Sequence, residues 1–273
     1  MKSMRMWLLT TTCLMAVAAA GAVQAADFSD QSVAFGKPGS LPAVSALNGK
    51  LAAFGGSQDG GLYGVAGSLS VPLGFAYGLQ VDGMAGSGDG AAFYGIGGHA
   101  FWRDPARGLL GLYGSYVTWD AHDGATASTD VGKFGVEGSA YLGRISLEGL
   151  AAYQFGTYTG FAGKALLAYY PSDNFRIDGG VRYLEGPGAI GTVGVEWQPH
   201  AGAGFTVFGS GSFGDGYTQA LGGVRAYFGG TNKSLIDRQR QDDPEAELPG
   251  DLTSGTACVA PKYWFEGVCR EPT

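Results

Sequence analysis

The sequence contains three histidines, the side chains that most often serve in acid–base catalysis near neutral pH. His99, His122 and His200 lie far apart in the chain. A hydrolase built on one of them needs a serine and a polar orienting group within hydrogen-bond reach. No Gly-x-Ser-x-Gly elbow occurs in the sequence. We therefore interpret His99 as a lumen or packing residue and His122 and His200 as residues of connections. We predict no enzymatic activity and no catalytic residue.

The sequence contains no recognisable motif for binding a metal ion or a dinucleotide. The aspartates and glycines around Asp89 and at 120–124 lack the spacing of a calcium-binding EF-hand loop. Glycine pairs such as Gly95 and Gly97 are not followed by a helical segment, as a dinucleotide-binding fingerprint requires. The sequence therefore predicts no metal site and no cofactor.

Polar and charged side chains recur at alternate positions of segments that are otherwise rich in glycine and aliphatic residues. Alternation places such side chains on one face of an extended chain. The residues that we expect to line the interior of a barrel in this way are Lys50, Gln80, Asp82, His99, Lys133, Glu137, Glu148, Gln154, Lys164, Arg176, Asp178, Arg182, Glu196, Gln198 and Arg225. Rings of such charges set the ion preference of pores. In the alternative arrangement the interior is closed by ion pairs of Lys164, Arg176 or Arg182 with Glu148, Asp178 or Glu196.

The segments that carry these residues have the pattern of β-strands. Apolar Tyr77, Leu79 and Val81, for example, alternate with polar Gln80 and Asp82. Turn-forming residues bound each segment. We predict twelve such strands, at residues 46–56, 61–71, 75–86, 92–103, 109–119, 129–142, 145–155, 161–170, 175–185, 189–198, 204–213 and 217–228.

Two kinds of connection alternate between these strands. Tight turns, as at 72–74 and 143–144, alternate with connections that are mostly rich in glycine and aspartate, as at 57–60 and 120–128. A strand of about ten residues crosses a bilayer when tilted, and bacterial barrels have even strand numbers and short periplasmic turns. We predict an all-β fold: a single closed antiparallel up-and-down transmembrane β-barrel of about twelve strands over residues 46–228, with both chain ends in the periplasm.

The composition agrees with a barrel that faces lipid. Fifty of the 273 residues are glycine and only 15% are charged, and this much glycine disfavours helices. Aromatic residues gather near the ends of the predicted strands, as they do in the girdles at a lipid interface. They are Tyr63, Phe75, Tyr77, Trp102, Tyr153, Phe155, Tyr169, Phe175, Tyr183, Trp197, Phe205 and Phe228. The alternative, a soluble β-sandwich or barrel, usually carries more charge opposite its core.

Residues 1–25 have the plan of a secretory signal peptide. Lys2 and Arg5 precede an apolar run, and small residues precede a predicted cut between Ala25 and Ala26. The alternative is a retained membrane anchor, which the polar Gln24 and the small residues disfavour. Removing the signal takes away two of 17 basic residues and none of 24 acidic ones, which leaves a net charge of 15 − 24 = −9. Nucleic-acid binding usually requires a basic face, so we predict no nucleic-acid partner.

Two segments flank the predicted barrel. We expect residues 26–45 to form an N-terminal periplasmic segment or a plug inside the barrel. Residues 229–273 start as a charged linker and continue to Cys258 and Cys269, which enclose several aromatic residues. In an exported chain two such cysteines predict one disulfide, since no histidine lies near them to complete a zinc site. We expect this segment to be a short periplasmic tail, either an ordered stub or a contact for a periplasmic partner.

Three stretches resemble a known group of proteins. They are Gly-Gly-His-Ala-Phe-Trp-Arg-Asp-Pro at 97–105, residues 111–119, and Gly-Gly-Val-Arg-Ala-Tyr-Phe-Gly-Gly at 222–230 followed by Lys-Ser-Leu-Ile at 233–236. Through them the chain resembles the small porin-like outer-membrane β-barrels of Gram-negative bacteria, especially uncharacterised alphaproteobacterial members. The resemblance implies contact with outer-membrane lipid. It also implies that the outer-membrane assembly machinery recognises the last strand, which ends at Phe228.

Together these features predict a passive narrow pore for small polar solutes or ions in the outer membrane. The alternative is a non-conducting barrel with a structural or interaction role. An outer-membrane lipid hydrolase is a third hypothesis, because outer-membrane phospholipases also form twelve-stranded barrels. The absence of a serine–histidine motif ranks it last.

Overall fold

The computed structural model describes residues 40–58, 60–88, 91–120, 126–214, 217–230, 232–242 and 244, together with three short strands near the C-terminus. The chain divides into two compact units, 1–34 and 35–273, and the described residues belong to the second. The predicted signal peptide, His122 and most of 26–45 lie outside the described residues.

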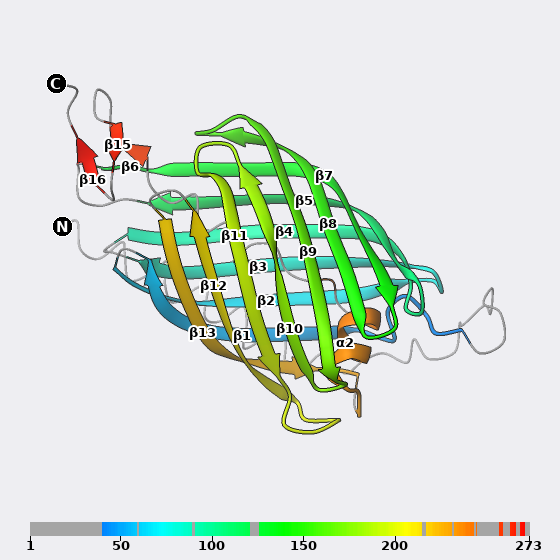
Figure 1. Ribbon diagram of the computed structural model, residues 1–273. Helices are drawn as coiled ribbons and strands as arrows, with labels where there is room; N and C mark the ends of the chain where they lie inside the picture. Colours follow the sequence, from blue (N-terminus) through cyan, green and yellow to red (C-terminus); the bar gives the residue numbers. More distant parts are fainter. Residues whose placement is uncertain are drawn as a thin grey trace, which may run out of the picture. The chain divides into compact units, whose positions relative to one another are not determined.

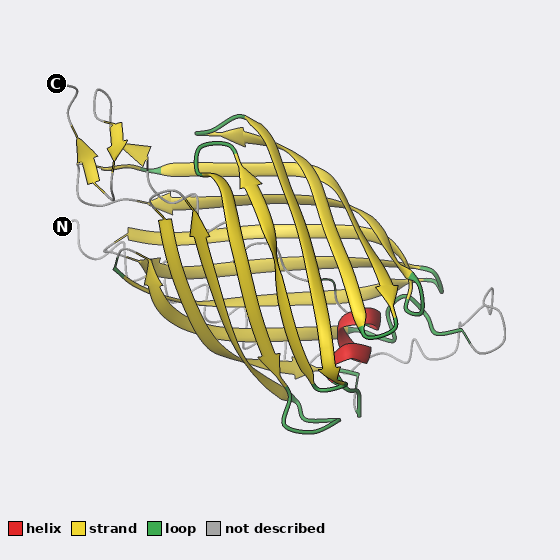
Figure 2. Ribbon diagram, in the orientation of Figure 1, coloured by secondary structure: helices red, strands yellow, loops and turns green. Residues whose placement is uncertain are grey.

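Twelve strands of the described chain form one closed barrel (Figure 1). They are β1 (Asn48–Gln58), β2 (Gly61–Leu73), β3 (Tyr77–Gly88), β4 (Ala91–Asp104), β5 (Gly108–Asp120), β7 (Thr129–Leu142), β8 (Ile145–Gly156), β9 (Gly160–Ser172), β10 (Phe175–Leu184), β11 (Gly188–Trp197), β12 (Phe205–Gly214) and β13 (Tyr217–Phe228). Neighbouring strands are antiparallel and follow one another along the chain, and β1 pairs with β13 to close the ring (Figure 2). The predicted fold class is confirmed.

Alternation along each strand turns apolar side chains outward and polar ones inward. In β3, Val81 is 56% exposed, whereas its neighbours Gln80 and Asp82 are 1% and 2% exposed. Exposed leucine, valine and isoleucine side chains recur around the barrel, while lysine, arginine and glutamate occur among the buried ones. A soluble barrel would bury the apolar face instead. The outer surface therefore suits hydrocarbon, and the closed sheet leaves no unpaired edge for lipid to meet.

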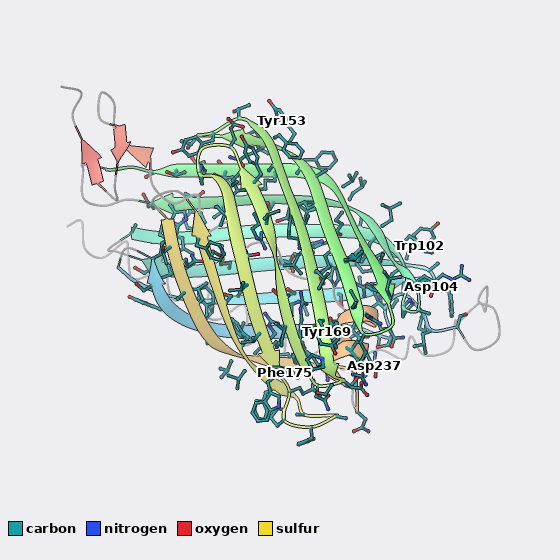
Figure 3. All side chains as sticks on the ribbon, in the orientation of Figure 1. Trp102, Asp104, Tyr153, Tyr169, Phe175 and Asp237 are labelled. Atoms are coloured by element: carbon teal, nitrogen blue, oxygen red, sulfur yellow. The ribbon has the colours of Figure 1, made fainter. Side chains whose placement is uncertain are left out.

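Aromatic side chains mark both ends of the outer surface. Ten of the twelve predicted girdle residues are exposed, and the remaining two, Phe75 and Phe175, are half-buried. Figure 3 shows Trp102 and Tyr169 towards one end of their strands and Tyr153 towards the other. Rings at this level match the amphipathic boundary between hydrocarbon and headgroups.

The two kinds of connection lie at opposite ends of the barrel. One rim, called the turn rim here, holds connections 73–77, 104–108, 142–145, 172–175 and 197–205. The other, called the opposite rim, holds 58–61, 88–91, 120–129, 156–160, 184–188 and 214–217. β1 begins and β13 ends at the turn rim, because Gly49 pairs with Phe228.

Close backbone approach at the β1–β13 seam depends on glycine. A side-chain carbon built at Gly56 would collide with the carbonyl oxygen of Ala220 in β13. Gly83 on the outer face of β3 has open space around the same position. The abundance of glycine thus reflects tight packing at particular sites and not a uniform requirement.

A short helix, α2 (Leu235–Gln241), follows the barrel where the sequence predicts a solvated linker. Its N-cap Ser234 accepts a hydrogen bond from the Asp237 backbone nitrogen at 3.3 Å. Seven residues are too few for a stable isolated helix, so the barrel wall must stabilise it. No helix in the described part of the chain is long and apolar enough to cross a membrane.

The C-terminal segment contains three short strands. β14 (Ala257–Cys258) pairs with β6 (Thr126–Ala127), and β15 (Tyr263–Phe265) pairs with β16 (Val268–Arg270). Because β6 lies between β5 and β7, β14 belongs to the opposite rim. The periplasmic location expected for residues 229–273 stays a prediction. The side chains of Cys258 and Cys269 lie outside the described parts, so the disulfide stays a prediction.

Candidate pore lumen

All fifteen residues predicted for the inner face are buried or half-buried. Fourteen lie in barrel strands, at positions that alternate with outward-facing residues, and Gln198 directly follows β11. The structure gathers many of them into three polar clusters. Whether solutes pass along these side chains stays a prediction.

The first cluster surrounds His99 on β4. Its Nε2 lies 2.8 Å from Asp82 Oδ2 and its Nδ1 lies 2.9 Å from Glu137 Oε1. The Gln80 amide donates to Asp82 Oδ1 at 2.8 Å. Two facing carboxylates suit an imidazolium, in which both ring nitrogens donate. Neither nitrogen is placed to accept a serine proton, so the geometry does not suit serine–histidine catalysis.

The second cluster joins β8, β9 and β10. Arg176 lies 3.2 Å from Glu148 Oε1 through Nη2 and 3.0 Å from Asp178 Oδ2 through Nε. The Lys164 ammonium lies 3.6 Å from Glu148 Oε2. These are pairs of the kind expected for a closed interior. Charges buried in this way must be matched because water cannot solvate them fully.

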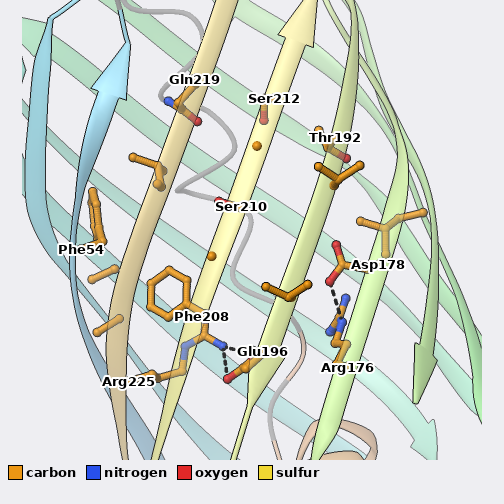
Figure 4. Close-up of a pocket in the computed structure, with 18 of the residues that line it drawn as sticks. Phe54, Arg176, Asp178, Thr192, Glu196, Phe208, Ser210, Ser212, Gln219 and Arg225 are labelled. Carbon is orange, nitrogen blue, oxygen red and sulfur yellow. Dashed lines mark hydrogen bonds and ion pairs between the residues drawn. The ribbon is translucent and has the colours of Figure 1, made fainter. Parts of the chain in front are cut away.

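The third cluster centres on Glu196 of β11. Both Glu196 oxygens lie 2.8 Å from Arg225 Nη1 (Figure 4). The hydroxyls of Thr206 and Tyr227 donate to Oε1 at 2.6 Å and 2.9 Å. One carboxylate with this many donors is well stabilised in its charged form. The sequence did not foresee Arg225 as the partner of Glu196.

A cavity of about 140 Å³ lies inside the barrel (Figure 4). Side chains from β1, β2 and β9–β13 line it, among them Arg182, Thr192, Ser210, Ser212 and Gln219. Ser210 is exposed although it faces inward, so this part of the lumen is accessible to water. The lining is mixed, with hydroxyls and charges beside small apolar groups. It provides hydrogen-bonding partners for a small polar solute.

Inward glycines do not simply widen the lumen. A side-chain carbon at Gly111 would lie 2.9 Å from Glu137 Oε1, and one at Gly194 would lie 2.6 Å from Asp178 Oδ1. The space left by these glycines is therefore occupied by neighbouring carboxylates.

Apolar side chains fill part of the interior near the opposite rim. This cluster comprises Phe54, Leu62, Met84, Phe93, Val117, Trp119 and Leu221. The rings of Phe93 and Trp119 lie 5.0 Å apart, close enough for favourable aromatic packing. The strands β1–β5 and β13 that carry these residues thus have a packed core on the lumen side, and Phe54 and Leu221 of this core also line the cavity.

Helix α2 lies in the mouth of the barrel at the turn rim (Figure 1). Gln239 contacts three strands: its Oε1 accepts from the Tyr170 hydroxyl at 2.7 Å and from Arg176 Nη1 at 3.2 Å. Its Nε2 donates to Glu196 Oε2 at 2.9 Å. One side chain of the helix therefore links the second and third polar clusters.

Arg240 fixes the next part of α2 to the rim. Its guanidinium donates to the carbonyl oxygens of Gly143 and Ile145 at 2.7 Å and 2.9 Å. It also lies 5.0 Å from the Tyr141 ring centre and 5.6 Å from that of Tyr170. Burial lowers the pKa of this guanidinium, which nevertheless stays protonated at neutral pH.

The segment before β1 also enters this mouth. Val44 is buried against Phe101. Ser45 Oγ donates to Asp242 Oδ1 at 2.6 Å, and Lys233 Nζ lies 2.7 Å from the same oxygen. Residues 40–45 are thus held at the turn rim, and whether residues 26–45 form a periplasmic segment or a plug stays a prediction.

Sequence reasoning missed several inward residues at this mouth, including Arg103, Ser70 and Tyr170, all of which are buried. Arg103 follows His99 at an even spacing on β4, so alternation alone could have identified it. Its position beside a tight turn hid this signal. No group of three metal-binding side chains occurs in the part of the chain that the structure describes.

Comparison with known proteins shows similarity in structure only. No protein-family model matches, and no curated protein matches. A KdgM porin superposes with a TM-score of 0.53 at 11% identity, covering 66% of this chain and 99% of the porin. The chain shares the barrel fold of this porin. A KdgM porin in complex with disordered oligogalacturonate gives a TM-score of 0.50 at 10% identity, with 66% and 99% coverage.

A weaker likeness joins the chain to an outer membrane phospholipase from Salmonella typhi. The TM-score is 0.48 at 12% identity, covering 70% of this chain and 93% of the phospholipase. This likeness is too distant to support an argument about catalysis. The resemblance to alphaproteobacterial barrels stays a prediction, since no family model supports it.

Proposed function

We propose that this protein is an outer-membrane barrel that provides a narrow passage for small polar solutes or ions. The observation that carries the proposal is the inverted distribution of polarity: an apolar outer surface encloses a charged lumen with a water-accessible cavity. Closed strands satisfy the backbone within lipid. Charges around the lumen then set which ions pass. In this proposal the turn rim faces the periplasm, as short turns do in bacterial barrels.

Arg182 is the side chain through which ion preference is most directly tested. It projects from β10, is only half-buried, and lines the cavity. Reversing its charge places an anionic group on the lining without removing a member of the three described clusters. Arg107 gives a matched control because it makes the same charge change in an exposed turn outside the lumen.

The experiment is single-channel recording from the refolded mature protein, residues 26–273, in a planar bilayer with a salt gradient. We expect small reproducible steps. Arg182→Glu should move the reversal potential towards cation preference, whereas Arg107→Glu should leave it near the wild-type value. If Arg182→Glu leaves the ion preference of the channel unchanged, the assigned lining is contradicted.

A second candidate function is a non-conducting barrel with a structural or interaction role. It is favoured by helix α2 in the mouth and by the ion pairs that Arg176 and Lys164 make with Glu148 along the inner wall. The same recordings separate the two candidates. Heat-dependent gel migration shows whether the protein is folded. If folded protein gives no channel current, the pore is excluded and this alternative is supported.

A further inference from the structure

The chain after β13 turns back into the barrel. β13 ends at the turn rim, where a tail released from the barrel would leave into solvent. Instead, Leu235, Arg238, Gln241 and Asp242 are all buried. Leu235 donates its backbone N–H to Asn174 Oδ1 in the β9–β10 turn at 3.3 Å. The direction of the chain at this point is therefore inward.

Buried wall side chains bind the backbone of the re-entering segment. Arg103 Nη1 donates to the Gln241 carbonyl oxygen at 2.6 Å. Ser70 Oγ donates to the Asp242 carbonyl oxygen at 2.7 Å. Both wall residues are almost fully buried. Every residue has a backbone carbonyl group. These hydrogen bonds therefore bind the tail whatever its side chains are.

Pro244 extends this series of contacts further into the lumen. Its carbonyl oxygen accepts from Lys50 Nζ at 3.2 Å and from Gln80 Nε2 at 3.3 Å. Lys50 pairs across β1 and β2 with Ser68, two residues deeper along β2 than Ser70. Pro244 also lines a second cavity, of about 40 Å³, with residues of β5 and β7–β10. Pro244 is therefore enclosed by the barrel wall.

The next described residues of the tail belong to the other end of the barrel. β14 pairs with β6 through Ala257 and Ala127 and through Cys258 and Thr126. β6 lies within the connection between β5 and β7, which is part of the opposite rim. The tail thus has one described point inside the lumen and a later one at the rim opposite its entry.

Chain length restricts the route between these points. Residues 244 and 257 are thirteen peptide steps apart, which span at most ~45 Å when extended. A tilted barrel wall of this kind is roughly 30 Å high, so a path through the lumen fits. A path outside the barrel would first have to return to the turn rim, so it is the longer of the two.

We propose that the C-terminal segment is threaded through the barrel, so that the barrel displays its own C-terminus at the opposite rim. The buried donors at the turn rim hold the entering backbone, and pairing of β14 with β6 holds the emerging chain. The test of this placement does not depend on conduction, because it reports where the chain end lies and not whether solute passes beside it. It adds a display role to the proposed pore.

The test compares the chain end with two reporters on one strand. Three cysteine-free variants (Cys13→Ala, Cys258→Ala, Cys269→Ala) each receive one new cysteine: Thr273→Cys at the chain end, Thr159→Cys at the opposite rim, or Ser172→Cys at the turn rim. Thr159 directly precedes β9 and Ser172 ends it, and both residues are exposed. A membrane-impermeant maleimide is applied to intact cells and to permeabilised cells.

We expect Thr273→Cys to react in the same preparation as Thr159→Cys, and Ser172→Cys to show the opposite accessibility. Because the reporters calibrate each other, the result does not depend on which rim faces outward. Labelling of Thr273→Cys together with Ser172→Cys would overturn the proposal. If the cysteine-free chain fails to fold, a C-terminal epitope on the native chain, read with antibody on intact and permeabilised cells, gives the same two outcomes.

Discussion

At the scale of single residues, the interior of the barrel is governed by charge matching. His99, Asp82 and Glu137 are each almost fully buried and satisfy one another through contacts of 2.8–2.9 Å. Water offers little compensation at such depth, so the loss of one partner leaves the others uncompensated. Exposed pairs such as Arg107 with Asp104 lose far less, since solvent screens them.

Replacing His99 by phenylalanine tests this contrast. His99→Phe removes the cation that lies between two buried carboxylates, so we expect the free energy of unfolding to fall by about 3 kcal/mol. Arg107→Ala, which breaks an exposed pair, should cost less than about 0.5 kcal/mol. Urea unfolding of the refolded barrel in lipid vesicles measures both. Equal unfolding midpoints for the two variants would show that the His99 cluster adds no stability.

At the scale of secondary-structure elements, the strands were predictable and α2 was not. Apolar and polar residues alternate with a period of two in each strand. This alternation identified both the strands and their inward faces. α2 is a short charged segment, Leu-Ile-Asp-Arg-Gln-Arg-Gln, and resembles a solvated linker. Its stability comes from wall groups distant in sequence, such as Tyr170 and the carbonyl oxygen of Gly143. The sequence of the helix itself does not show which distant residues will stabilise it.

The same limit applies to the candidate site. The alternation along each strand identified the inward charged residues. It did not predict which of them pair between strands, as Glu196 does with Arg225. Pairing depends on strand register, which here brings inward side chains of β11 and β13 together across β12. The re-entry of the tail was missed for a related reason. Arg103 and Lys50 donate to backbone carbonyl oxygens of the tail. Because every residue has such an oxygen, no residue type in the tail marks these contacts in the sequence.

Glycine at the barrel seam provides a prediction for strand packing. Gly56→Ala drives a methyl group into the Ala220 carbonyl of β13, and we expect a loss of roughly 1–3 kcal/mol in unfolding free energy. Gly83→Ala is the matched control, because nothing lies within 4 Å of the added carbon. Urea midpoints measured side by side decide the issue. A Gly56→Ala protein as stable as Gly83→Ala would mean that β1 and β13 pack less closely than described.

At the scale of the whole molecule, the apolar outer surface distinguishes a membrane barrel from a soluble one. Val136 lies at the middle of β7 and Leu142 at its end, and both are exposed. In water, arginine at either position is nearly neutral. In lipid, arginine costs about 2–4 kcal/mol at the midplane and only about 0–1 kcal/mol near the interface.

Arginine substitutions at these two sites therefore test the lipid-facing surface. Val136→Arg should reduce the free energy of unfolding in vesicles by about 2–4 kcal/mol, and Leu142→Arg by no more than about 1 kcal/mol. Reversible unfolding in urea measures the difference. If both substitutions prove neutral, the outer surface of the barrel does not face hydrocarbon.

We propose that solutes pass through a polar lumen and that helix α2 restricts its mouth. The most direct test of this proposal is the single-channel conductance of the mature chain against the double variant Gln239→Ala/Arg240→Ala, which removes the contacts of α2 with Tyr170, Glu196 and the turn rim. Arg107→Ala serves as a surface control. We predict small steps for the wild type and the control and larger steps for the double variant. Silence from all three folded proteins would contradict a conducting lumen, and equal steps would contradict the role of α2.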